Sequence, residues 1–99
     1  MNPQQIQQMM KQAQRMQDQL HHEMQATQVE ATAGGGLVTV KFSGDKRLLS
    51  IKIDPEGVSK DDVEMLQDSI MSAVNDALRK VDDTLKAKMG NMMPPGMGL

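Results

Sequence analysis

Residues 28–53, which read QVEATAGGGLVTVKFSGDKRLLSIKI, decide the fold. Apolar and polar residues alternate in three short runs, and the turn-forming stretches GGG at 34–36 and SGDK at 43–46 separate those runs. Alternation with a period of two is typical of strands that bury one face, and short glycine-rich loops join neighbouring antiparallel strands. The stretch therefore predicts a three-stranded antiparallel meander. Its polar face carries six residues: Glu30, Thr32, Thr39, Lys41, Ser50 and Lys52.

The triple glycine at 34–36 could also suggest a phosphate-binding loop. Such a loop needs Lys followed by Ser or Thr at the start of a helix, whereas here a predicted strand follows the glycines. We therefore interpret the glycines as a hairpin loop.

A long helix is predicted before the sheet, from about Pro3 to Ala26. Its apolar residues recur at alternating intervals of three and four, which is the spacing of a heptad seam. The seam consists of Ile6, Met9, Ala13, Met16 and Leu20. We interpret this methionine-rich stripe as core and dimer interface, because methionine fills irregular apolar gaps.

A second long helix is predicted after the DPEG turn at 54–57, from about Lys60 to Lys88. Ser59 is the expected N-cap, the acids at 61–68 suit the positive end of the helix dipole, and Gly90 is the expected end. The apolar stripe of this helix comprises Val63, Leu66, Ile70, Val74, Ala77, Leu78, Val81 and Leu85. The fold class is thus α+β, with one domain at 1–89 and a disordered Met/Pro/Gly-rich tail at 90–99.

The composition argues against a metal centre, a cofactor or catalysis. The 99 residues include no cysteine, and the two histidines, His21 and His22, are neighbours that point about 100° apart on a helix. The acids at 61–68 lack the loop spacing of a metal site, and no catalytic arrangement of Ser, His and Asp is evident. We expect no metal site, no cofactor, no small-molecule substrate and no enzymatic activity.

Size and geometry predict a homodimer. A core in so short a chain is weakly stabilising, and oligomerisation is a common supplement. The predicted helices are about 35 and 43 Å long, whereas the strands span about 20 Å, so the apolar stripes extend beyond the sheet and need a second copy to cover them. No apolar run approaches the roughly 20 residues that span a membrane, and the N-terminus lacks signal-peptide features. We expect the protein to remain in the compartment where it is made.

Charge is unevenly distributed along the chain. The net charge is −2, yet residues 1–16 contain Lys11 and Arg15 and no acid, and residues 79–99 contain four cations and two acids. If the helices run antiparallel, residues 11–15 and 79–88 meet at the end away from the sheet, and two-fold symmetry doubles them. Phe42 is the only aromatic residue, so stacking on single-stranded bases is disfavoured and contact with duplex phosphates is the available mode.

Several motifs together resemble the YbaB/EbfC family of nucleoid-associated proteins, over about residues 6–89. They are MKQAQ at 10–14 with MQ at 16–17, AGGGLVxV at 33–40, Gly44, IxIDP at 51–55, LxD at 66–68 and AVNDA at 73–77. The resemblance implies a tweezer-like homodimer with paired helical arms, a location in the bacterial cytoplasm and nucleoid, DNA binding, and a role in nucleoid organisation or gene regulation.

The family's expected DNA contacts are basic residues of the two helices. By the resemblance these are Lys11, Arg15, Arg79, Lys80, Lys86 and Lys88, although Asp82 and Asp83 lie among the last four. Lys41 and Lys52 on the sheet are the alternative cations. The alternative function is a prefoldin-like holdase chaperone or a protein-interaction adaptor that grips its target in a methionine-lined groove, although these helices are short for a holdase and only three strands are predicted.

Overall fold

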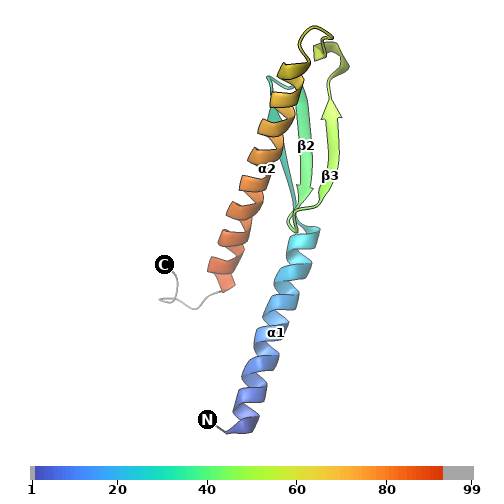
Figure 1. Ribbon diagram of the computed structural model, residues 1–99. Coiled ribbons are helices and arrows are strands. Elements are labelled where there is room, and N and C mark those ends of the chain that lie inside the picture. Colours follow the sequence, from blue (N-terminus) through green and yellow to red (C-terminus); the bar gives the residue numbers. More distant parts are fainter. Residues whose placement is uncertain (1, 93–99) are drawn as a thin grey trace.

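The structure, a computed structural model, describes residues 2–92. The elements in chain order are α1 (Pro3–Ala26), β1 (Gln28–Ala33), β2 (Val38–Ser43), β3 (Leu48–Ile53), the short 3₁₀ helix η1 (Pro55–Gly57) and α2 (Val63–Met92). The protomer measures 70 × 24 × 16 Å. In Figure 1, α2 lies along the sheet and α1 projects from one end of it. The α+β class and the order of elements predicted from the sequence are confirmed.

The sheet is the predicted antiparallel meander, with strand order β1-β2-β3. Gly34, Gly35 and Gly36 all have positive φ angles, of 67°, 67° and 97°, a region that residues with a side chain rarely adopt. A Cβ atom on Gly34 would also lie 2.5 Å from the Ser69 hydroxyl oxygen. The glycines are therefore required for the hairpin and for its close approach to α2.

Helix α1 has the predicted bounds. Asn2 caps its start: its Oδ1 accepts a hydrogen bond from the Gln5 amide at 2.8 Å, and the Gln5 side chain accepts one from the Asn2 amide, which is a capping-box arrangement. Only the C-terminal part of the helix reaches the core, through half-buried Leu20 and buried Met24. The rest of α1 is exposed along its whole circumference and forms an arm.

The start of α2 differs from the prediction. The helix begins at Val63 and not at Lys60, and its capping side chain is that of Asp62, whose Oδ1 accepts from the Met65 amide at 3.1 Å. Ser59, the predicted N-cap, instead holds a turn: its carbonyl accepts from the Asp62 amide and its hydroxyl from the Asp61 amide. Residues 60–62, which the sequence analysis assigned to the helix, therefore precede it and belong to this turn.

The end of α2 also differs. The helix continues through Gly90 to Met92, so Gly90 does not end it and Lys86 and Lys88 do not lie in its last turn. A glycine inside a helix costs only about 1 kcal/mol, which the neighbouring helix-forming residues can offset. Residues 93–99 of the predicted tail lie outside the described residues, and the division at 89/90 stays a prediction.

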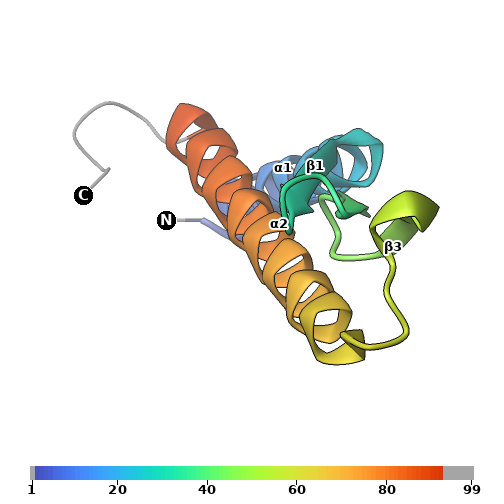
Figure 2. The ribbon, with the colours of Figure 1, turned by 90° about the horizontal axis from the view of Figure 1, so that it is seen from above.

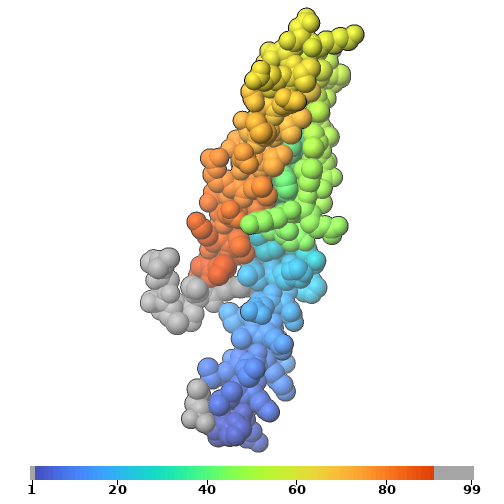
Figure 3. Space-filling model, viewed as in Figure 1, coloured from blue at the N-terminus to red at the C-terminus, as the bar shows by residue number. Residues whose placement is uncertain are grey.

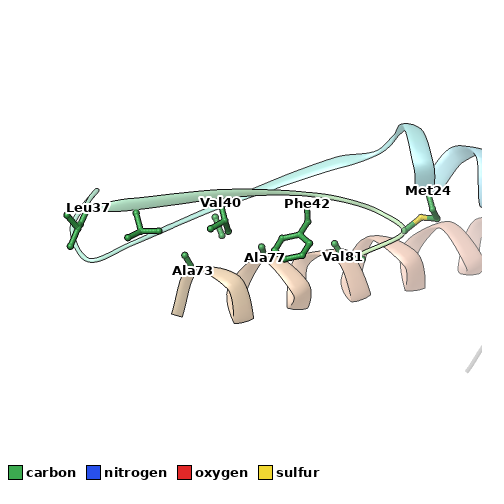
Figure 4. Packing of buried hydrophobic residues seen from close by; sticks show 9 residues of the cluster. Met24, Leu37, Val40, Phe42, Ala73, Ala77 and Val81 are labelled. Atoms are coloured by element: carbon green, nitrogen blue, oxygen red, sulfur yellow. The ribbon is translucent and has the colours of Figure 1, made fainter. Parts of the chain in front are cut away.

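The core lies between α2 and the sheet (Figure 4). Ala73 and Ala77 of α2 are completely buried, and their small side chains let the helix approach the strands closely. The buried set is Met24, Ala31, Leu37, Val38, Val40, Phe42, Ala73, Ala77 and Val81. Met24 is the one methionine in this cluster, so, within residues 2–92, the core consists mainly of Val and Ala with Leu37 and Phe42, and the methionine stripe lies outside it.

Helix α2 covers only part of the sheet. It packs against β1 and β2, and the view in Figure 2 shows β3 at the side away from α2. Ile51 and Ile53 of β3 face the same side as Val40 and Val38, their partners in the register, yet remain 43% and 39% exposed. One edge of the apolar face is therefore uncovered in the protomer.

Candidate nucleic-acid interface

The arm presents a basic face. Gln8, Lys11, Gln12 and Arg15 are spaced i, i+3, i+4 and i+7, so they share one side of α1, where they line a shallow hollow of about 180 Å³. All four are exposed, and residues 2–17 contain no acid. Two cations flanked by two amide side chains can donate hydrogen bonds to phosphate oxygens and to neighbouring polar groups.

The opposite side of the arm is apolar. Ile6, Met9 and Met16 are 45%, 55% and 45% exposed, although their heptad spacing is that of a packed seam. Figure 3 shows this part of α1, in blue, projecting beyond the rest of the protomer. A second molecule that covered the seam would leave Lys11 and Arg15 on the outer side of the arm.

The predicted cations of α2 are mostly engaged within the chain. Lys80 Nζ donates to the carbonyl oxygen of Glu30 in β1 at 2.7 Å, Arg79 pairs with Asp76 at 3.2 Å, and Lys88 pairs with Glu23 at 3.6 Å. Lys86 is exposed and forms no salt bridge or side-chain hydrogen bond with any residue from 2 to 92. The Arg79–Asp76 ion pair is exposed and the Lys88–Glu23 pair is half-buried. Ion pairs at a protein surface are weak, so these two cations can exchange their partners for phosphate.

The two sets of cations do not converge as predicted. Because Lys88 pairs with Glu23, the C-terminal part of α2 lies beside the base of the arm, and Lys11 lies twelve residues, or about 18 Å of helix, farther out. Arg79 and Lys80 lie over the sheet, as the bond to β1 shows. The expectation was wrong because α1 projects from the sheet instead of lying on it beside α2.

Sequence reasoning missed the cations of the β2–β3 turn. Lys46 pairs with Asp82 at 3.3 Å, and Arg47 is exposed. The Gly44 amide donates to the carbonyl of Thr27 at 2.9 Å, which places this turn at the base of the arm. The sequence signal was two adjacent cations in a turn, but the contact between that turn and the end of α1 is a tertiary feature.

The polar face of the sheet holds the alternative cations. Lys41 lies directly opposite Glu30, and Lys52 opposite Thr39, while the Thr32 and Thr39 hydroxyls are 3.2 Å apart. A carboxylate opposite Lys41 partly neutralises this face, whereas the basic face of the arm has no such neighbour within residues 2–17.

A second hollow, of about 380 Å³, lies at the other end of the protomer. Gly34, Asp62, Glu64, Asp68 and Ser69 contribute to its lining. Within residues 2–92 no group of three or more His, Cys, Asp or Glu residues is arranged to hold a metal ion, and no helix there is long and apolar enough to cross a membrane.

Comparison with known proteins points to one family. The sequence profile of the YbaB/EbfC DNA-binding family matches residues 1–97. A nucleoid-associated protein of Koribacter versatilis is 51% identical over 94 residues, covering 95% of this chain and 92% of that one. A nucleoid-associated protein of Chloroflexus aurantiacus is 48% identical, covering 90% and 89%. An uncharacterized Helicobacter pylori protein of known crystal structure has a similar fold, with a TM-score of 0.83, 29% identity and coverage of 95% and 99%.

Proposed function

We propose that this chain, which belongs to the YbaB/EbfC DNA-binding family, acts as a homodimeric nucleoid-associated protein that grips duplex DNA with its helical arms. In this role it organises the bacterial nucleoid and affects the expression of nearby genes. The observation that carries the proposal is the arm itself: a projecting helix with Lys11 and Arg15 on one side and an uncovered apolar seam on the other.

The uncovered apolar surface supports a dimer. On α2, half-buried Leu78 lies nearly opposite Lys80, because successive helical residues are about 100° apart. Lys80 bonds to β1, so Leu78 is on the side toward β3. That side continues the exposed apolar residues of the last strand, namely Leu48, Leu49, Ile51 and Ile53. A contiguous apolar area of this kind on a small protein is characteristic of an interaction surface.

Phosphate contact is the mode of recognition that the side chains favour. Lys and Arg neutralise phosphates without reading base sequence, and the one aromatic side chain, Phe42, is buried in the core, so it is not available for stacking. We propose Lys11 and Arg15 as the principal contacts and Lys86 as a further one. Arg79, Lys80 and Lys88 would contribute after exchanging their partners within the chain.

Filter binding of a random-sequence duplex over a series of salt concentrations tests this proposal. A dimer that uses two or three cations per subunit contacts about four to six phosphates, so log K should fall against log salt with a slope of about −4 to −5. Absence of duplex binding at low salt would contradict the proposal. An aggregation-suppression assay on the same preparation tests the alternative holdase function, for which we see no specific structural support.

A further inference from the structure

The joint between α1 and β1 is very short. Thr27 is the C-cap of α1, and β1 begins at the next residue, Gln28. The cap closes the last turn of the helix, because the Thr27 amide and hydroxyl both donate to the Glu23 carbonyl, at 2.9 and 2.6 Å. The backbone has two soft dihedral angles per residue, so small rotations at this joint would swing the whole arm. Another contact is needed to fix the direction of α1.

The β2–β3 turn, residues 44–47, packs against this joint. The Gly44 amide donates to the Thr27 carbonyl at 2.9 Å, and Gly44 is buried. A Cβ atom there would lie 2.5 Å from the Met24 carbonyl oxygen and 3.0 Å from its Cα atom. Gly44 has no positive φ angle, so its lack of a side chain matters for this close approach and not for its own conformation. In Figure 1 the turn lies at the C-terminal end of α1.

The turn is firmly attached to the sheet. The Ser43 amide donates to the Arg47 carbonyl at 2.9 Å, and the Lys46 amide donates to the Ser43 carbonyl at 3.0 Å. The buried Ser43 hydroxyl accepts from the Arg47 amide at 3.1 Å and also bonds the Asp45 carboxylate. Helix α1, by contrast, reaches the core only through its C-terminal part. If the contact between turn and helix is crowded, the helix should therefore move and the turn should stay.

We infer that Gly44 is a positioning residue for DNA binding, because the close approach that it permits fixes the angle between α1 and the sheet and thereby the place of Lys11 and Arg15. The inference rests on the proposed function. A Cβ at residue 44 would have to move the last helical turn by about 1 Å to reach ordinary van der Waals distance. Over one turn of about 5.4 Å, that shift tilts α1 by about 10° and moves Lys11, about 20 Å farther out, by about 3–4 Å.

The ion pair of Lys88 with Glu23 also reaches the C-terminal part of α1. An ion pair at a protein surface contributes little and tolerates rearrangement. Overlap between backbone atoms, in contrast, is relieved only by movement of one of the two segments. The contact at Gly44 is therefore the stronger determinant of the helix direction.

Gly44→Ala is the test variant, and Gly57→Ala is its matched control. Gly57 also has no positive φ angle, and a Cβ atom there would lie 2.7 Å from Leu37 Cδ1, so both variants crowd an existing contact. Gly57 lies in η1, which follows β3 at the end of the sheet away from α1 (Figure 1). Residual dipolar couplings of the backbone amides measure the angle between α1 and the sheet in the full chain without DNA.

In the natural chain we expect the couplings of α1 and of the sheet to fit one common alignment tensor. Gly44→Ala should rotate α1 by about 10° relative to the sheet, and Gly57→Ala should leave the angle unchanged. An unchanged angle in Gly44→Ala would overturn the inference. So would an equal rotation in Gly57→Ala, or a natural chain in which α1 does not share the alignment of the sheet.

Filter binding of a random-sequence duplex supplies the functional measurement. Loss of one phosphate contact lowers affinity about tenfold at 0.1 M salt, which is the smallest loss that we expect from Gly44→Ala, whereas Gly57→Ala should bind like the natural chain. Both variants are compared well below their melting temperatures, so a difference in affinity reports the position of the arm. A rotated arm with natural affinity would overturn the role in DNA binding. If the natural chain binds no duplex, the proposed function fails, and the coupling data still test the joint.

A second variant, Asp45→Ala, serves if circular dichroism shows that Gly44→Ala does not fold. It removes the carboxylate that bonds the Ser43 hydroxyl and adds no atoms to the contact with α1. The loosened turn should let α1 move, which should reduce the couplings of α1 relative to those of the sheet. Couplings of undiminished size in this variant would contradict the inference in the same way.

Discussion

The two long helices carry similar apolar stripes but have opposite fates in the protomer. On α2, Ala73, Ala77 and Val81 are completely buried against the sheet, whereas on α1 Ile6, Met9 and Met16 remain about half exposed. Helical periodicity therefore shows that a face will be covered, but not by what. The apolar stripe of α2 forms the core of the protomer. We attribute the apolar stripe of α1 to contact with a second copy.

The largest expected effect comes from placing a charge in the buried face of α2. Ala77→Asp places a carboxylate in a fully buried position next to the strands, where an unpaired charge costs several kcal/mol. A domain of this size has little stability to lose, so we expect the chain to be unfolded at 25 °C by circular dichroism. A folded variant would show that α2 does not form the core.

The next effect concerns the basic face of α1. Replacing Lys11 and Arg15 together by Gln removes four cations from a dimer, which should lower duplex affinity about a thousandfold at 0.1 M salt and flatten the salt slope by about 3 to 4. The loss should be equal on duplexes of different sequence, with an unchanged melting temperature. Changing Lys41 and Lys52 to Gln is the matched control, and a greater loss from that pair would assign DNA to the sheet instead.

A smaller effect is expected on the apolar face of α1. Met9→Asp should leave the protomer folded, because Met9 is outside the core, but should weaken dimerisation about a hundredfold, as expected if each of two copies loses about 1.5 kcal/mol of apolar burial. Sedimentation equilibrium measures this change. If the unmodified chain is already a stable folded monomer at micromolar concentration, the apolar seam of α1 is not a dimer interface.

These contrasts also define what the sequence could and could not predict. The strands, the Gly34–Gly36 hairpin and the bounds of α1 followed from periodicity and turn chemistry, which are local. The start of α2 did not, because Ser59 and Asp62 are both good capping residues and only the turn that Ser59 holds decides between them. Local rules do not resolve such a competition.

The candidate site was predictable in its residue types and not in its arrangement. Lys11 and Arg15 are indicated by the uneven charge of the chain and by the family resemblance, and the structure adds that both line one face of α1. The separation of these two from Arg79 and Lys80 depends on α1 touching the core only through Leu20 and Met24, which no periodicity reveals. The ion pair of Lys88 with Glu23 and the hydrogen bond from Lys80 to β1 also join residues that are far apart in the sequence, so local patterns do not predict them.

The smallest expected effect concerns the far end of α2. Gly90 lies inside the helix, and within the described part of the chain a Cβ added there would meet no atom within 4 Å apart from its own stretch of helix. Gly90→Ala should therefore stabilise the fold by up to about 0.5–1 kcal/mol, because alanine loses less backbone entropy in a helix, and raise the melting temperature by a few degrees. Gly34→Ala is the contrasting change: at a φ of 67° and with Ser69 at 2.5 Å, it should lower the melting temperature. If Gly90→Ala also lowers the melting temperature, α2 ends at Gly90 in solution and does not continue to Met92.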